Sequence, residues 1–152
     1  MLVSTKGRYA LRVLLELAEH EQQDPGAYMC LDCIAESQGI SEKYLESIVS
    51  ILVKAKMVAG QRGRGGGYRL TRSPDQYSVG EVLHLTEGSL APVSCLGSCS
   101  AQCDRAAGCR TLPMWRKLDD MIGGYLNSVT LLDLLEAPLP GDAAADEAPE
   151  KP

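Results

Sequence analysis

The sequence predicts a mainly α-helical protein with one small β-hairpin and a long helix near the C-terminus. Three observations support this prediction. Apolar side chains recur every three or four residues in several segments, as on the buried face of a helix. Two short runs of alternating apolar and polar residues flank the glycine-rich stretch 62–67, as in a hairpin. Pro113 opens the last long periodic segment, and proline suits the first turn of a helix.

The bulk properties point to one domain with an appendage. A chain of 152 residues is of ordinary domain size. No run of about 18 apolar residues is present, so no membrane span is expected. Arg12 and Glu16 interrupt the first apolar segment, which argues against a signal peptide. We therefore expect a cytoplasmic, reducing setting, in which cysteines serve more often as ligands or redox groups than as structural disulfides.

The first half of the chain is predicted to hold three helices. Residues 5–20 form the first, and Asp24-Pro25-Gly26 marks the turn that follows it. Residues 31–38 form a short second helix that ends at Gly39. Ser41 caps the third, 42–56, whose expected buried stripe is Leu45, Ile48, Val49, Leu52 and Val53. The last two helices have the dimensions of a helix-turn-helix.

The second half is predicted to complete a winged helix-turn-helix with a long C-terminal dimerisation helix. Residues 57–61 and 68–71 form the hairpin, or wing, and Ser78 caps a short helix that reaches about Glu87. A helix from Pro113 to about Asn127 follows, and a last short helix starts at Thr130. The predicted organisation is a winged-helix domain, a cysteine-rich loop, a dimerisation helix with the short final helix, and a disordered acidic tail, at residues 1–87, 88–112, 113–136 and 137–152.

The net charge of −5 conceals an uneven distribution. Residues 1–72 carry ten Lys and Arg against eight Asp and Glu, whereas the last twenty residues carry one against six. The predicted winged helix is therefore mildly basic, which is compatible with binding to double-stranded DNA.

The helix 42–56 and the hairpin are the candidate DNA-binding elements. An exposed helix face can enter a major groove about 12 Å wide, where side chains reach base edges. On this helix Glu46 is predicted to accept a hydrogen bond from a cytosine amino group, and the other candidate contacts to bases or phosphates are Lys43, Ser47 and Ser50. At the hairpin tip, Arg62 and Arg64 suit a minor groove.

Other interpretations of these two elements are weaker. Residues 42–56 could be an ordinary amphipathic surface helix, and the hairpin a connector. The glycine-rich stretch 62–67 does not fit a phosphate-binding loop, because no GKS or GKT follows it and the next element is a strand. No nucleophile and base pair is suggested either, so an enzyme is not expected. The order of the elements favours DNA binding.

Four cysteines, Cys95, Cys99, Cys103 and Cys109, fall within fifteen residues of the loop. Thiolates are soft ligands that suit zinc or an iron–sulfur cluster, and they also form disulfides. The spacing alone leaves these three possibilities open, together with a metal-carrying protein that has no DNA function. Cys30 and Cys33 form a second group at the start of the predicted helix 31–38, and we expect them to pack in the helical core. The alternative is a redox-active or metal-binding pair, since the N-terminus of a helix lowers the pKa of a thiol.

Several motifs together resemble one known family. STKGRYA, QGISEKYLESIVSIL, RGRGGGYRL and SVGEVL, within about residues 1–135, are similar to the iron–sulfur-cluster regulators, which include IscR-like, NsrR-like and RirA-like transcription factors and cluster-free CymR-like relatives. The resemblance implies a homodimer that pairs through the helix after Pro113 and binds a palindromic operator. It places Tyr44 and Glu46 on the recognition helix and Arg62 in the minor groove.

The resemblance also implies an iron–sulfur cluster as the cofactor, controlling the affinity for the operator. Cys103 and Cys109 align with two cluster ligands of the family, and Cys95 fits the longer spacing of members with a 4Fe–4S cluster, which favours 4Fe–4S over 2Fe–2S. The chain departs from IscR-like members at Gly97, Leu112 and Arg8, where no ligand side chain stands. Cys99 is an added thiol that could be the fourth ligand, and zinc is the alternative metal.

Overall fold

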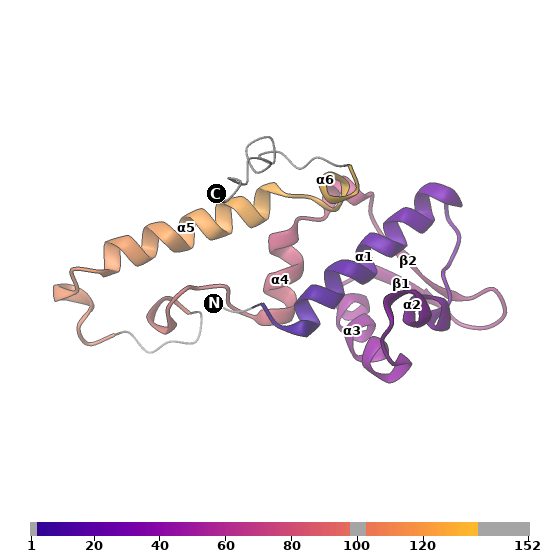
Figure 1. Ribbon diagram of the computed structural model, residues 1–152, viewed down its shortest axis with the longest axis horizontal. Helices are drawn as coiled ribbons and strands as arrows, with labels where there is room; N and C mark the ends of the chain where they lie inside the picture. Colours follow the sequence, from indigo (N-terminus) through magenta and orange to yellow (C-terminus); the bar gives the residue numbers. More distant parts are fainter. Residues whose placement is uncertain (1–2, 98–102, 137–152) are drawn as a thin grey trace, which may run out of the picture.

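The computed structural model describes residues 3–97 and 103–136. Its order of elements is that of a winged helix with a long C-terminal helix, which confirms the predicted fold class (Figure 1). The helices and strands are α1 Thr5–Gln23, α2 Leu31–Gln38, α3 Glu42–Lys54, β1 Val58–Gln61, β2 Gly67–Leu70, α4 Val79–Glu87, α5 Leu112–Ser128 and α6 Leu131–Leu135. Among the helices of these described residues, none is both long and apolar enough to cross a membrane. The tail 137–152, predicted to be disordered, lies outside the described residues.

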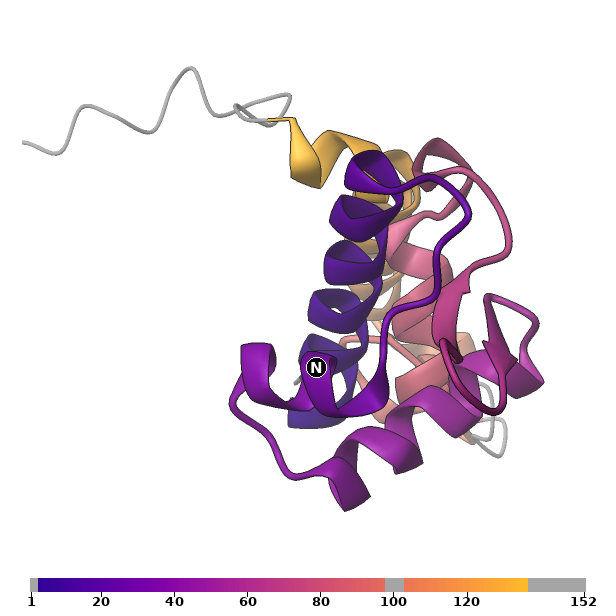
Figure 2. The ribbon, with the colours of Figure 1, turned by 90° about the vertical axis from the view of Figure 1, so that its right-hand side faces the viewer.

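Helix α1 is the centre of the hydrophobic core. The Ser4 side chain accepts a hydrogen bond from the Gly7 amide and caps the helix, which extends three residues beyond the predicted end to Gln23. Its buried side chains face α3, α4 and α6, and they are Ala10, Val13, Leu14, Leu17 and Ala18. Figures 1 and 2 show α3 on one side of α1, while α4 to α6 cover another side.

The helix-turn-helix forms as predicted, with two corrections in α3. Gly39 adopts the left-handed conformation at the end of α2, and the Ser41 side chain caps α3 by accepting from the Tyr44 amide. The helix ends at Lys54 rather than at residue 56, because Lys56 has a positive φ of 59° and turns the chain into β1. Val53, predicted to be buried, is 37% exposed, since the stripe that packs on the core narrows at the last turn.

The wing is a two-stranded antiparallel hairpin anchored to the segment before α2. Val58 pairs with Leu70, and Gln61 pairs with Gly67. The amides of Met29 and Tyr68 each donate to the other's carbonyl, at 2.9 and 2.8 Å. Gly67 has a φ of 147°, and a Cβ there would overlap the Met29 carbonyl oxygen, so only glycine allows this close approach. The tip end of the strands and the start of α2 therefore form one hydrogen-bonded unit.

Tyr77 fixes the other end of the wing to the core. Its side chain is fully buried, and its hydroxyl donates to the Met57 carbonyl at 2.6 Å. The same hydroxyl accepts from the amides of Thr71 and Arg72, each at 3.0 Å. One phenol thus satisfies three backbone groups at the points where the chain enters β1 and leaves β2. The sequence around Tyr77 has no pattern that predicts this anchoring of the wing.

Replacing Tyr77 by phenylalanine is expected to lower the free energy of unfolding by about 2 kcal/mol, because the Arg72 amide loses its acceptor and the Met57 carbonyl loses its shortest hydrogen bond. Urea unfolding followed by circular dichroism measures this loss. Tyr28→Phe is the matched control, since the contact of the ring with the Arg69 guanidinium, 4.8 Å from the ring centre, survives the change. The control is expected to shift stability by less than about 0.5 kcal/mol. Equal effects of the two substitutions would contradict the proposed anchor.

The C-terminal part of the chain returns to α4. The Val79 amide donates to the Val129 carbonyl at 2.8 Å, and Gly80 lets α4 approach Asn127 at the end of α5. These contacts with α4 hold the C-terminal end of α5. Its N-terminal end extends away from the winged-helix body toward the cysteine-rich loop (Figure 1).

Candidate functional site

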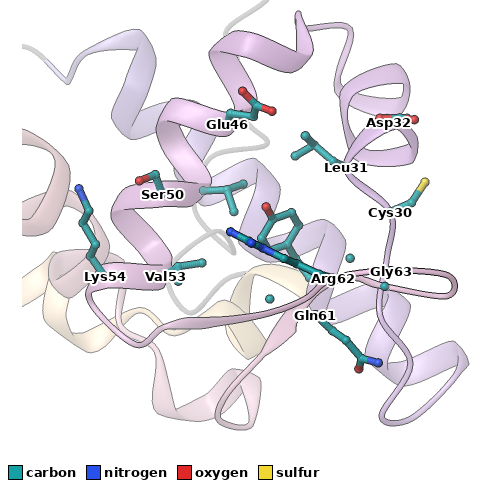
Figure 3. A pocket seen from close by; sticks show the side chains of 15 residues that line it. Cys30, Leu31, Asp32, Glu46, Ser50, Val53, Lys54, Gln61, Arg62 and Gly63 are labelled. Atoms are coloured by element: carbon teal, nitrogen blue, oxygen red, sulfur yellow. The ribbon is translucent and has the colours of Figure 1, made fainter.

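A groove of about 670 Å³ separates α3 from the wing (Figure 3). On one side it is bounded by the exposed face of α3, from Glu46 to Lys54, and on the other by the wing residues Gln61, Arg62 and Gly63. The start of α2 closes one end, where Cys30, Leu31 and Asp32 line it. The groove combines basic side chains of Lys54 and Arg62 with acidic side chains of Asp32 and Glu46.

The structure places the predicted DNA-contacting residues of α3 in two groups. Lys43, Glu46, Ser47 and Ser50 are exposed, and of these Glu46 and Ser50 line the groove. Tyr44 is half-buried and meets Tyr9 edge to face, with ring centres 6.0 Å apart. Its ring therefore supports the orientation of α3 on α1, in addition to any contact that its hydroxyl makes.

The wing tip exposes both predicted arginines. The Gly66 amide donates to the Gly63 carbonyl at 3.0 Å, and the positive φ values of Gly63 and Gly65 make the turn tight. Arg62 lines the groove, and Figure 3 shows its side chain directed toward α3. Arg64 lies at the tip, exposed and outside the groove lining. The two arginines thus present positive charge in two different places.

Sequence reasoning did not identify two groove residues of α3, Val53 and Lys54, as part of this surface. Val53 has the spacing of a core residue, whereas Lys54 is an exposed residue of the last turn of α3. A signal was present for Lys54, because a basic residue in the last turn of a recognition helix can reach a phosphate.

Three of the four loop cysteines line one small pocket of about 120 Å³. They are Cys95, Cys103 and Cys109, and the remaining lining comes from Leu96, Ala106, Leu112 and Arg116. Short turns of 3-10 helix at Ser94–Leu96 and Ala106–Gly108 position the cysteines on either side. Cys99 lies outside the described residues. Leu112 is buried at this pocket and has no ligand atom.

The donor set of this pocket, three cysteine sulfurs, is of the kind that holds an iron–sulfur cluster. Within residues 3–97 and 103–136, no three His, Cys, Asp or Glu side chains are grouped closely enough to hold one ion. The pocket instead spaces three sulfur donors around a cavity, and all-sulfur ligation is typical of iron–sulfur clusters. The contact of the Cys109 thiol with the Thr111 hydroxyl, at 3.4 Å, lowers the pKa of Cys109 and favours the thiolate that binds metal.

The structure corrects the expectation for Cys30 and Cys33. These cysteines do not pack in the core: Cys33 is exposed, Cys30 is half-buried, and the two form a disulfide. The reason is their position at the first turn of α2, where Ile34 and Ala35 supply the buried face instead. The Cys30 sulfur accepts from the Cys33 amide at 3.0 Å and caps the helix.

Comparison with known proteins identifies relatives along nearly the whole chain. The family model Rrf2, described as an iron-dependent transcriptional regulator, matches residues 3–137. The HTH-type transcriptional regulator IscR of Vibrio campbellii is 39% identical over 136 residues, which cover 90% of this chain and 78% of the relative. IscR of Vibrio cholerae is 40% identical, with 89% of this chain and 75% of the relative covered.

Solved structures agree with this assignment. IscR from T. potens has a TM-score of 0.66 and 32% sequence identity, and the match covers 99% of this chain and 94% of that structure. CymR, the global cysteine regulator of B. subtilis, has a TM-score of 0.69 and 34% identity over 88% of this chain and 95% of that structure.

These relatives are regulators of transcription and not enzymes, as the sequence predicted. Helix α3 is the second helix of a helix-turn-helix, the element that such regulators place in the major groove of double-stranded DNA. The chain belongs to the Rrf2 family of DNA-binding transcriptional regulators.

Proposed function

We propose that the protein is a homodimeric regulator whose affinity for a palindromic operator is controlled by an iron–sulfur cluster. The ligands are Cys95, Cys103 and Cys109, with Cys99 as the fourth and 4Fe–4S as the favoured cluster. The observation that carries this proposal is the pocket where three cysteines meet at the free end of α5, away from the DNA-binding groove.

The DNA contacts divide between α3 and the wing. Glu46 and Ser50, with Lys43 and Ser47 on the same exposed side, are suited to the major groove. We assign the neighbouring minor groove to Arg64 at the tight wing tip rather than to Arg62, which the resemblance implies, because Arg62 lines the groove and is directed toward α3. Between these two positions the phosphate backbone would pass over the groove that Arg62 and Lys54 line. Arginine and lysine there can neutralise phosphates.

The dimer interface that we propose is the exposed apolar stripe of α5. Met114, Leu118, Met121 and Tyr125 are 54%, 38%, 59% and 56% exposed. Their spacing of four, three and four residues places them along one side of the helix, as at the core positions of a coiled coil. Pairing of this stripe with its copy about a two-fold axis buries all four side chains, and a two-fold dimer binds a palindromic site.

The cysteine pocket is in direct contact with the proposed dimer helix. Leu112 and Arg116, both in α5, line the pocket together with the three thiols. A bound cluster would supply chemistry that responds to oxidants, to nitric oxide or to the supply of iron. The chain's own residues would hold it as thiolates, with the Arg116 guanidinium offsetting their negative charge. Without the cluster, Cys95, Cys103 and Cys109 would no longer be tied together beside the start of α5, which would shift the population of DNA-binding dimers.

Operator affinity measured with and without the cluster tests this function. We expect the cluster-loaded and the cluster-free protein to differ at least about fivefold in affinity, as coupled sites typically do. Arg62→Ala combined with Arg64→Ala is expected to weaken both forms and to reduce the salt dependence of binding by about two counterions. Fluorescence anisotropy with labelled promoter DNA under anaerobic conditions measures both effects. Equal affinities of the two forms would reject control by the cluster, and an unaffected arginine variant would reject the proposed role of the wing.

A further inference from the structure

The disulfide between Cys30 and Cys33 belongs to the DNA-binding surface rather than to the cysteine-rich loop. The Cα atoms of the two residues are 5.2 Å apart, within the range that a disulfide requires. Cys33 is exposed and Cys30 is half-buried in the lining of the groove, so small reactants in solution can reach Cys30 from the groove. Cys30 lines the groove between α3 and the wing, and Figure 3 shows it at the edge of that groove opposite α3.

The pair is also connected to the wing through the backbone. Met29, which directly precedes Cys30, exchanges two hydrogen bonds with Tyr68 of β2. Gly67 at the start of β2 packs so closely that a Cβ there would meet the Met29 carbonyl and the Cys30 amide. A change in the conformation of the first turn of α2 is therefore one residue away from the strand ends that carry the wing tip.

We propose that Cys30 and Cys33 are a redox-active dithiol that exchanges with low-molecular-weight disulfides and that modulates DNA affinity. This site is separate from the proposed cluster ligands, and its effect on DNA rests on the proposed placement of α3 and the wing. The thiol–disulfide chemistry itself does not rest on that placement.

The exchange proceeds in two balanced steps. The Cys30 sulfur lies at the N-terminus of α2 and accepts the Cys33 amide, an environment that stabilises a thiolate. The Cys30 thiolate attacks the disulfide RSSR, forms a mixed disulfide and releases one RS⁻. The Cys33 thiol then loses its proton and attacks the Cys30 sulfur, which releases the second RS⁻. Two cysteine thiols and RSSR thus become one protein disulfide and two RSH, and a small thiol reverses the reaction.

The oxidised form is expected to bind DNA more tightly. The disulfide is neutral and cross-links the first turn of α2 beside the wing anchor. In the reduced form, a Cys30 thiolate would add negative charge to a groove that already holds Asp32 and Glu46. This charge opposes the DNA phosphates, and the uncoupled first turn leaves the wing less well held. We expect an affinity about three- to tenfold lower in the reduced form.

The experiment equilibrates the full-length protein anaerobically in buffers of reduced and oxidised glutathione and measures two properties of each sample. The first is the redox state of the pair, by alkylation of free thiols and mass spectrometry. Trypsin releases residues 13–43 as one peptide that holds only Cys30 and Cys33, whereas the loop cysteines fall in peptides 73–105 and 106–110. The second property is operator affinity. Cys30→Ser combined with Cys33→Ser is the matched control, because serine keeps a helix-capping side chain at residue 30 and neither position can then exchange with glutathione.

The expected result is a reversible transition of peptide 13–43 between two thiols and one disulfide, with operator affinity following the same curve in the wild type and staying constant in the double serine variant. A pair that stays in one redox state throughout would overturn the exchange site. An affinity change that persists in the double serine variant would overturn the effect on DNA and assign it to the loop cysteines. If no form binds promoter DNA, the proposed DNA placement fails, while the peptide still reports whether the dithiol exchanges.

Discussion

Met121→Glu is expected to convert the protein to a monomer and to lower its affinity for a palindromic operator by about a hundredfold. Met121 lies near the middle of the α5 stripe and is 59% exposed in the single chain. In a two-fold dimer the substitution would bring two carboxylates into an apolar interface, where burial of unpaired charge is costly. A monomer also loses the gain in effective concentration that comes from holding two half-sites together.

Sedimentation equilibrium measures the mass of the Met121→Glu variant in solution, and anisotropy measures its affinity for the operator. Met121→Leu is the matched control, because it keeps an apolar side chain of similar volume at the same position and is expected to remain dimeric. Circular dichroism should give the same helix content for both variants, since Met121 is not part of the buried core. A Met121→Glu protein that stays dimeric would show that α5 does not carry the interface.

Cys103→Ser is expected to remove the cluster almost completely. Cys103 lines the pocket with Cys95 and Cys109, and a serine hydroxyl is a harder and poorer ligand for iron than a thiolate. Loss of one of the three donors that the pocket brings together leaves too few thiolates to hold a cluster. Anaerobic absorbance spectra, together with iron and sulfide analysis, measure the loss.

Two comparisons sharpen the test of Cys103. Cys33→Ser removes a thiol that lies outside the pocket and is expected to leave the cluster intact. Cys99→Ser distinguishes a fourth thiolate, which predicts a bleached protein, from a three-cysteine set, which predicts a retained cluster. A colourless wild-type protein with one zinc per chain would overturn the iron–sulfur assignment.

The helices and the wing were predictable because their signals are local. Apolar periodicity identified α1 and α3, serine caps identified the starts of α3 and α4, and Gly39 identified the end of α2. Each of these signals depends on residues within one or two turns of one another. The ends of α1 and α3 were off by two or three residues for the same reason, since helix termini depend on the tertiary contacts beyond them.

The errors concern residues whose environment is set by distant parts of the chain. Val53 has the spacing of a core residue, but the wing leaves a groove beside it rather than covering it. Cys30 and Cys33 were predicted to pack in the core. Helix α2 instead buries Ile34 and Ala35, which leaves the two cysteines on its outer side, where they form a disulfide. Tyr77 gave no signal at all, because its hydroxyl acts on Met57, twenty residues earlier in the chain.

The amino-acid sequence alone was enough to establish a winged helix with basic residues at its wing tip and a set of thiols ahead of a long helix. Local propensity and helix capping depend only on neighbouring residues, so the order of the helices and the wing can be predicted from them. Folding in three dimensions added the relations between distant residues. It brought Cys95, Cys103 and Cys109 to one pocket, and it left the α5 stripe exposed. It also set the Cys30–Cys33 pair against the groove, because packing geometry, and not spacing along the chain, determines which side chains meet.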